Sequence, residues 1–253
     1  MPGDGYLSGL ARELAPEALD RFLRYVQIDT SSDPHSTTYP SSEKQLDLLR
    51  LLADECREAG LAEVVLDEHG YVTASVPATV GHAVPTLGLI AHVDTYPGVT
   101  GTSVTPQVIR YEGGDVALPG DPAQVLSPRE MPLLDEHVGH ELVTSDGTTL
   151  LGADDKAGVA EIMAAVAYLK RHPELEHAPI RVCFTVDEEV AGGADHLDID
   201  RFGARYAYTL DGAELGEIEA ETFNALNVSA SISPRLDPSS VYARSAPNSA
   251  RSR

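Results

Sequence analysis

The sequence predicts an α/β sandwich with a largely parallel or mixed sheet, because short apolar runs of strand character alternate with longer stretches of helical period. Its 253 residues, 42% of them hydrophobic, are enough for one large domain or two small ones with a real core. Clusters of acidic side chains follow several of the apolar runs. In such sheets ligand sites lie at the carboxyl ends of strands, so these clusters are the first candidates for chemistry.

Helices are expected in three places. Residues 16–28 put their apolar side chains on one helical face, and a second helix begins near Ser42, carries a leucine stripe and ends at Gly60. Residues 31–42 are polar and rich in turn-forming residues, so we expect a loop between these helices. The strongest helical pattern covers residues 155–171.

Strand patterns lie between and after these helices. Residues 64–66 and 71–76 flank a short turn signal and predict a β-hairpin. Residues 95–138 hold many Gly and Pro residues with little periodicity, so we expect a long irregular insertion, followed by a short strand candidate at Leu142-Val143. Three further apolar runs predict buried strands: residues 87–90, 180–186 and 206–210.

The formal net charge is −22, from 40 acidic and 18 basic residues. A surface of this sign repels phosphate groups, so neither nucleic acid nor an anionic membrane is an expected partner. Residues 1–10 lack the basic and apolar regions of a signal peptide, and no apolar run approaches the roughly 20 residues of a membrane span. The expectation is a soluble, cytoplasmic protein in which Cys56 and Cys183 are small core residues.

The first polar cluster is His92-x-Asp94, directly after the run 87–90. Residues i and i+2 of a strand project to the same side, and an imidazole that binds a metal usually donates its other N–H to a carboxylate. A single His-x-Asp is a weak signal, for which a surface or turn role would be favoured. His196-x-Asp198 has the same spacing, but no strand precedes it, so we interpret that pair as structural.

The second cluster is Asp154-Asp155-Lys156, at the start of the expected helix over residues 155–171. An aspartate at a helix start has an obvious alternative role as an N-cap. Two adjacent acids followed by a lysine and flanked by glycines exceed what a cap requires. A single carboxylate has two oxygens and can bridge two cations about 3.5–4 Å apart.

The third cluster, Asp187-Glu188-Glu189, ends the run 180–186, and the fourth is Asp211, just after the run 206–210. Three adjacent acids usually form a solvated turn, and a lone Asp is most often a turn residue. After buried strands, these acids would instead enter the crevice where ligands bind, and one could bind a metal while its neighbour takes a proton from water. One His with several carboxylates suits Zn²⁺, with Mn²⁺ or Co²⁺ as alternatives.

In order and spacing, the four clusters resemble the metal-site motifs of the dinuclear zinc peptidase superfamily that includes aminoacylase and carnosinase-type dipeptidases. Within it, the chain is similar to the tripeptide aminopeptidases of the peptidase T family. That similarity lies in residues 113–118 and 126–128 of the insertion and in residues 144–158 and 219–224. The resemblance covers roughly residues 19–232 and implies a three-layer sandwich with a mixed, largely parallel sheet.

The resemblance implies a role for six residues. Two would be catalytic: Glu188 as general base, and Asp94, which would orient His92. Four would bind zinc: His92 and Asp211 at one ion, Glu189 at the second, and Asp154 between both. The implied reaction releases the N-terminal residue of a tripeptide by attack of a metal-bound hydroxide. A dipeptidase or N-acyl amino acid hydrolase of the same superfamily, and a non-catalytic metal-binding fragment, are the alternatives.

The sequence departs from this family towards its C-terminus. The family has a second His ligand there, and no His follows His196 in this chain. Residues 1–222 are expected to form the zinc peptidase catalytic domain, and residues 223–232 the first strand of a truncated lid domain. Residues 233–253 are rich in Ser, Arg and Pro and are expected to be an out-of-frame, disordered tail. The second zinc site is therefore expected to be incomplete, activity to be impaired and the family's homodimer to be absent.

Overall fold

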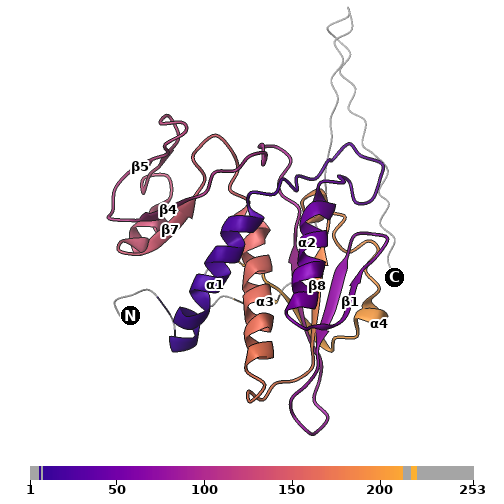
Figure 1. Cartoon of the computed structure of the whole chain (residues 1–253). Helices are drawn as coiled ribbons and strands as arrows, with labels where there is room; N and C mark the ends of the chain where they lie inside the picture. Colours follow the sequence, from indigo (N-terminus) through magenta and orange to yellow (C-terminus); the bar gives the residue numbers. More distant parts are fainter. Residues whose placement is uncertain (1–5, 7, 213–217, 221–253) are drawn as a thin grey trace, which may run out of the picture. The chain divides into compact units, whose positions relative to one another are not determined.

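The computed structural model describes residue 6, residues 8–212 and residues 218–220. The chain divides into two compact units, Met1–Asp211 and Gly212–Arg253. All helices and strands of the described part belong to the first unit (Figure 1). The expected lid strand over residues 223–232 and the expected tail over residues 233–253 lie outside the described residues.

The centre of the first unit is a five-stranded sheet with the strand order β1-β2-β8-β3-β9. The pairings of β1 with β2 and of β2 with β8 are antiparallel, whereas β3 pairs in parallel with both β8 and β9. The predicted hairpin and the predicted mixed sheet are therefore confirmed. The strands are β1 (Ala62–Leu66), β2 (Val72–Val76), β3 (Leu87–His92), β8 (Ile180–Thr185) and β9 (Tyr206–Thr209).

The parallel half of the sheet brings three polar clusters together at the carboxyl ends of its strands. In the register of β3 with β8, Leu87 lies beside Ile180 and His92 beside Thr185. Strand β9 continues the same direction on the other side of β3. Because parallel strands end at the same edge, the residues that follow β3, β8 and β9 are placed close together.

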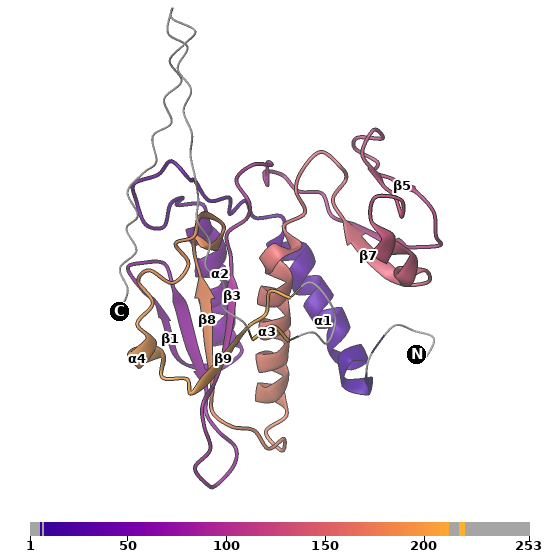
Figure 2. The same cartoon turned by 180° about the vertical axis from the view of Figure 1, so that it is seen from behind.

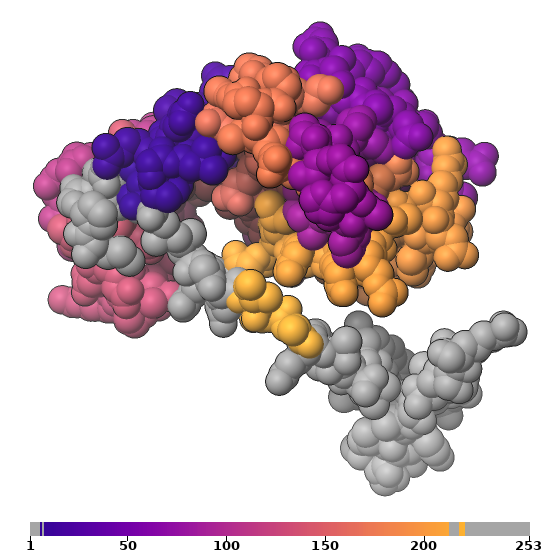
Figure 3. Space-filling view, turned by 90° about the horizontal axis from the view of Figure 1, so that it is seen from below, coloured from indigo at the N-terminus to yellow at the C-terminus, as the bar shows by residue number. Residues whose placement is uncertain are grey.

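Three helices, shown in front of the sheet in Figure 1 and behind it in Figure 2, form the layer that covers one of its faces. Helix α3 packs against β3, α2 packs against β1 and β2, and α1 packs against α3. Seen from below, α1 lies directly against the C-terminal end of α3, where Arg171 donates to Glu17 (Figure 3). The helices are α1 (Gly9–Tyr25), α2 (Gln45–Glu58) and α3 (Ala153–Arg171). Among the described helices, none is long and apolar enough to cross a bilayer.

The core between helices and sheet is built from the apolar stripes that the sequence predicts. Leu48, Leu49 and Leu52 of α2 are fully buried, as are Ile162 and Met163 of α3. Both cysteines are free and fully buried, which confirms their interpretation as core residues. Helix α1 begins earlier than predicted, because the Ser8 side chain caps it by accepting a hydrogen bond from the Ala11 amide at 3.0 Å.

The insertion differs from the prediction of an irregular segment. It forms two small antiparallel sheets and one 3-10 helix: β4 (Gln107–Arg110) with β7 (Glu141–Thr144), β5 (Val116–Ala117) with β6 (Val125–Leu126), and η1 (Pro132–His137). Strand β7 lies after the insertion and confirms the strand candidate at Leu142-Val143. Strands β4, β5 and β6 have two to four residues and are too short to show a period in the sequence.

The prediction that residues 206–210 form a buried strand is correct for the strand and wrong for the burial. All four residues of β9 are exposed, with Tyr206 at 60% and Tyr208 at 49%. Among the described strands, β9 lies at the edge of the sheet and pairs only with β3. The short helix α4 (Ile199–Phe202) precedes it and places Phe202 against Gly88, where an added Cβ would lie 2.8 Å from the ring.

Candidate metal centre

The structure brings the four predicted clusters together around the ring of His92. Its Nε2 atom lies 2.9 Å from Asp154 Oδ1, 3.7 Å from Asp211 Oδ2 and 4.0 Å from Glu188 Oε2. The His92 side chain is only 3% exposed, whereas those three carboxylates are 70%, 37% and 56% exposed. One buried imidazole therefore faces a group of carboxylates that solvent can reach.

Asp94 fixes the other side of the ring. Its side chain is fully buried, and its Oδ1 atom lies 3.3 Å from His92 Nδ1. The same ring nitrogen lies 3.0 Å from the Asp94 carbonyl oxygen, so it is the nitrogen that carries the proton when the ring is neutral. In the metal-free protein a protonated Nε2 donates to Asp154 Oδ1 at 2.9 Å. Loss of that proton would leave the Nε2 lone pair for a metal while Nδ1 keeps its own, as a metal-binding histidine requires.

Asp94 also holds the third cluster. The amide of Glu188 donates to Asp94 Oδ1 at 3.0 Å, and the amide of Glu189 donates to Asp94 Oδ2 at 3.1 Å. One buried carboxylate thus connects the end of β3 with the turn after β8. It sets the distance between the imidazole and the two glutamates.

The second cluster lies on a distorted turn at the start of α3. Gly152 has a left-handed backbone with φ of 79°, and neither Asp154 nor Asp155 has helical angles, so the regular helix begins only after them. The prediction that Asp155 begins the helix is thus corrected by one residue. The turn sends the two carboxylates to different sides: Asp154 faces the His92 ring, and Asp155 is 2% exposed.

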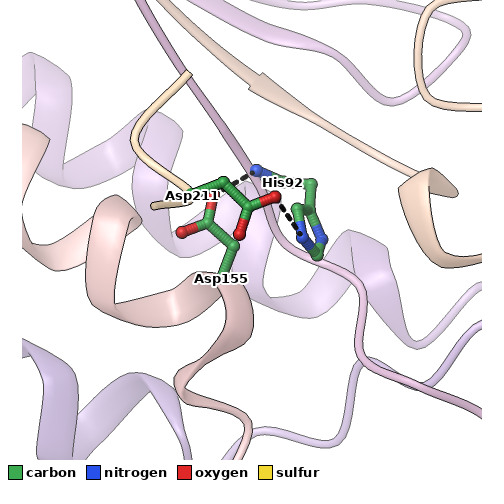
Figure 4. A group of neighbouring side chains, drawn as sticks. All are labelled: His92, Asp155 and Asp211. Atoms are coloured by element: carbon green, nitrogen blue, oxygen red, sulfur yellow. Dashed lines mark hydrogen bonds and ion pairs between the residues drawn. The ribbon is translucent and has the colours of Figure 1, made fainter. Parts of the chain in front are cut away.

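Asp155 is a site residue to which the sequence assigned no role of its own. Its Oδ2 atom accepts the backbone N–H of His92 at 3.1 Å. Figure 4 shows it beside His92 and Asp211, and each of the three offers a ligand atom within 4.8 Å of the others. Among the described residues, this is the one group of three His, Cys, Asp or Glu side chains with such spacing. Adjacent acids were the available signal, but the sequence could not tell which side each would face.

Gly158 allows α3 to come close to the strand that leads to Asp211. A Cβ atom at this position would lie 2.1 Å from the carbonyl oxygen of Leu210 and 2.4 Å from Asp155 Oδ1. Such contacts do not occur between real atoms, so a side chain here would force α3 and the end of β9 apart. The position of Asp211 relative to His92 therefore depends on a glycine in α3.

The three acids of the third cluster do not act alike. Asp187 turns away from the centre, is 2% exposed, and its carboxylate accepts hydrogen bonds from Ser41 and Gln45. The expectation that all three acids enter the ligand crevice is wrong for Asp187, because its left-handed backbone with φ of 56° reverses the direction of the chain. Glu188 and Glu189 are left to face the centre.

The pKa values reflect an excess of negative charge. Burial, together with neighbouring carboxylates, raises the pKa of Glu189 and of Asp211 to about 6. Burial also raises the pKa of Asp155 to about 8, although His92 opposes this. For His92, burial alone would lower the pKa, but the hydrogen bond and charge of Asp94 outweigh it and raise the pKa to about 10. A cation among these carboxylates would relieve the repulsion that makes them hold protons.

Lys156 is a buried cation next to the centre. It is 2% exposed, and its Nζ donates to the carbonyl oxygen of Ile28 at 2.7 Å. Burial lowers its pKa to about 8, and the charges of Asp29 and Asp94 oppose that shift. It links the start of α3 to the segment after α1.

The second His-x-Asp pair has the structural role that we predicted. Asp198 caps α4, since its Oδ1 accepts the Arg201 amide at 2.9 Å. The ring of His196 stacks on His69, with centroids 4.3 Å apart and an interplanar angle of 6°.

Comparison with known proteins identifies relatives of the chain. Residues 136–229 match Peptidase family M20/M25/M40. The chain is 53% identical over 210 residues to peptidase T of Geobacillus thermodenitrificans, which covers 83% of this chain and 51% of that protein. It is 48% identical over 220 residues to peptidase T of Clostridium acetobutylicum, covering 87% of this chain and 54% of the relative. The chain thus spans about half the length of the curated relatives it matches.

Solved structures show the same fold. A tripeptidase from Staphylococcus aureus superposes with a TM-score of 0.54 at 26% identity, over 79% of this chain and 44% of that chain. Aminopeptidase PepT from Bacillus cereus gives a TM-score of 0.54 at 27% identity, with the same coverage of 79% and 44%. The mixed sheet with its helical layer is thus the fold seen in these enzymes. Together with the sequence matches, this likeness makes the chain a homologue of peptidase T, in which residues 136–229 match Peptidase family M20/M25/M40.

Proposed function

We propose that this chain is the metal-binding part of a zinc peptidase that releases the N-terminal residue of tripeptides. The observation that carries the proposal is the two-sided environment of His92: Asp94 holds its Nδ1, while Asp154 and Asp211 face its Nε2. The similarity to peptidase T and to a tripeptidase supports the substrate class.

The donor set suits zinc. We assign His92 and Asp211 to one ion, Asp154 to a bridging position and Glu189 to a second ion. Imidazole and carboxylate donors are usual zinc ligands. Asp155 lies in the same group, but one of its oxygens already accepts the His92 amide, which favours a positioning role over a ligand role.

The residues of the chain divide the remaining work. When bound, zinc would supply a Lewis acid that polarises the scissile carbonyl and lowers the pKa of water. Glu188 would accept the proton of that water and later pass it to the leaving amine. Its side chain is 56% exposed and its Oε2 is 4.0 Å from His92 Nε2, so it can reach both the centre and a substrate. Asp94 holds the Glu188 amide and thereby sets the distance of this base from His92.

The two ions would be held unequally by the described residues. Asp154 and Glu189 offer only carboxylates to the second ion, and two carboxylates hold zinc less well than a set with an imidazole. We therefore expect this 253-residue chain to bind one zinc ion more tightly than a second, and to turn over slowly. A chain that binds zinc without turnover would fit the second candidate function, a metal-binding unit without catalysis.

The similarity to peptidase T supports small peptides as partners. The net charge of −22 disfavours nucleic acid and anionic membranes as ligands. We also propose a cytoplasmic location, in keeping with two free, buried cysteines.

Two measurements on the purified chain test the proposal. Calorimetric titration of the chelator-treated protein with Zn²⁺ measures stoichiometry and affinity, and a tripeptide assay measures turnover beside the variant Glu188→Gln. We expect Glu188→Gln to bind zinc like the unmodified chain and to lose turnover by about 10²–10⁴-fold, the usual contribution of a general base. No zinc binding, or equal turnover in both proteins, would contradict the proposal. His196→Ala serves as the control for a histidine outside the centre.

A further inference from the structure

The glutamates of the centre lie on a loop that is held at both ends by one segment of the chain. We call residues 187–193, which follow β8, the acidic loop. Residues 39–45, which lead into α2, contact it on both sides of Glu188 and Glu189.

The first contact is at Asp187, just before the glutamates. Its buried carboxylate accepts the Ser41 amide at 2.7 Å, the Ser41 hydroxyl and the Gln45 side-chain amide at 2.6 Å. In return, the Asp187 amide donates to Gln45 Oε1 at 3.1 Å. The Gln45 side chain is fully buried and makes a reciprocal pair of hydrogen bonds with Asp187.

The second contact is just after the glutamates. The Tyr39 hydroxyl donates to the Gly192 carbonyl oxygen at 2.9 Å, and the Tyr71 hydroxyl donates to that of Gly193 at 3.3 Å. The loop also closes on itself, because the Gly192 amide donates to the Asp187 carbonyl oxygen at 2.7 Å. A Cβ at Gly193 would lie 3.2 Å from Glu188 Cα, so the two ends of the loop enclose the glutamate backbone.

The conformation of the loop requires these contacts. Asp187 and Ala191 have left-handed backbones, with φ of 56° and 62°. For residues other than glycine this conformation is unfavourable, because Cβ comes too close to the following carbonyl oxygen. It persists only where surrounding contacts determine it. Gln45 and Ser41 supply those contacts at Asp187.

We propose that Gln45 is a positioning residue: by binding Asp187 it fixes the backbone from which Glu188 and Glu189 reach the metal centre. The consequence for metal binding rests on the proposed function, whereas the consequence for the loop does not. The competing interpretation is that Gln45 only fills a buried polar gap and adds stability to the whole domain. The two interpretations differ in which amides exchange faster in a Gln45 variant: those of the acidic loop alone, or those of the whole domain.

The test compares Gln45→Leu with Leu52→Ala, a buried variant of the same helix that does not touch the acidic loop. Hydrogen exchange is measured without metal, at the amides of Glu188, Glu189 and Gly192 and at amides of α3. Losing the two hydrogen bonds between Gln45 and Asp187 predicts exchange at the loop amides of Gln45→Leu that is faster by about tenfold or more, beyond any change in α3. Leu52→Ala should change both regions alike. Loop amides that exchange no faster than α3 in Gln45→Leu would overturn the proposal.

Zinc titration of the same proteins gives the second measurement. Gln45→Leu should weaken zinc binding by about 10–100-fold, the usual effect of losing a group that orients a ligand, while Leu52→Ala should bind as before. Unchanged zinc affinity beside a loosened loop would overturn the positioning role. If the unmodified chain binds no zinc, the proposed function fails, and exchange alone decides whether Gln45 holds the loop. Should Gln45→Leu not fold, Ser41→Ala removes one donor to Asp187 and is measured in the same way.

Discussion

The chain contains two His-x-Asp pairs with the same spacing and different chemistry. His92 is the last residue of β3, Asp94 follows that strand, and the two side chains are 3% and 0% exposed. His196 and Asp198 lie on an exposed loop, where the histidine stacks on His69 and the aspartate caps a four-residue helix. Spacing alone therefore does not identify a metal site.

Burial and connectivity separate the two pairs. Asp94 accepts hydrogen bonds from the backbone amides of Glu188 and Glu189 and contacts the ring of His92, so it connects His92 with both glutamates. Asp198 accepts one amide from its own helix. The first pair is buried, and the carboxylates that face it are exposed to solvent. In the second pair, Asp198 only caps its own helix. The following variants test whether this difference between the two pairs also appears in stability and zinc binding.

The largest effect is expected for Asp94→Ala. The change leaves the amides of Glu188 and Glu189 without their acceptor and removes the partner of a buried imidazole, which together should cost about 3–5 kcal/mol. Asp154→Ala removes an exposed carboxylate and should change stability by less than about 0.5 kcal/mol. Urea unfolding of both metal-free proteins measures the difference. Similar losses for the two variants would mean that the buried Asp94 and the exposed Asp154 contribute equally to the free energy of unfolding.

Gly158→Ala should come next. In an ordinary helix this change stabilises by about 1 kcal/mol, but here the added Cβ would meet the Leu210 carbonyl at 2.1 Å. Overpacking of this kind costs about 1–3 kcal/mol, and the displaced Asp211 should also weaken zinc binding. Gly9→Ala, at the start of α1 with nothing within 4 Å, is the matched control. Unfolding and zinc titration of both variants check the prediction; a Gly158→Ala chain as stable as Gly9→Ala would contradict it.

A third prediction concerns pH. The folded-state pKa values of Glu189 and Asp211 are raised to about 6, that of Asp155 to about 8 and that of His92 to about 10. Between pH 5 and 8 the folded, metal-free chain therefore binds more protons than the unfolded chain at each of these groups. Their contribution to stability is present at the acid end of this window and is lost as pH rises.

The stabilisation by bound zinc should have the opposite pH dependence. The ligands must lose their protons to bind a metal, so zinc affinity rises with pH, by about tenfold per unit for each proton displaced. Melting temperatures at pH 5.5 and 7.5, with and without zinc, give the measurement. We expect the metal-free melting temperature to fall and the gain from zinc to grow between these two values. A metal-free chain that becomes more stable over this interval would show that the carboxylates around His92 do not govern it.

Much of the fold follows from the sequence because its longest elements have clear periods. Helix α3, strand β8 and the β1–β2 hairpin all lie where their patterns predict them. Strands β4, β5 and β6 of the insertion are not predicted, because they are too short to show a period. Strand β9 was expected to be buried because apolar composition does not reveal whether a strand lies at an edge.

The site could be predicted as a set of clusters, but the division of roles within each cluster could not. Three adjacent acids look equivalent in the sequence, yet the left-handed backbone of Asp187 turns its carboxylate towards Gln45 and leaves the centre to its neighbours. Asp154 and Asp155 lie on one turn, which points their carboxylates in different directions. The geometry of this turn depends on Gly152 and on contacts with β3. Such choices are made by tertiary contacts, which a pattern along the chain does not contain.

The smallest effect on the metal centre is expected for Asp198→Ala, in the pair that resembles the metal site only in spacing. Removing the N-cap of α4 should cost about 1 kcal/mol. Its carboxylate touches no residue of the centre that the structure describes, so zinc affinity should stay as in the unmodified chain. Urea unfolding and zinc titration, run beside Asp94→Ala, measure both quantities. A loss of zinc binding in Asp198→Ala would mean that the second pair also contributes to the metal centre, because a weakened α4 alone gives no reason for it.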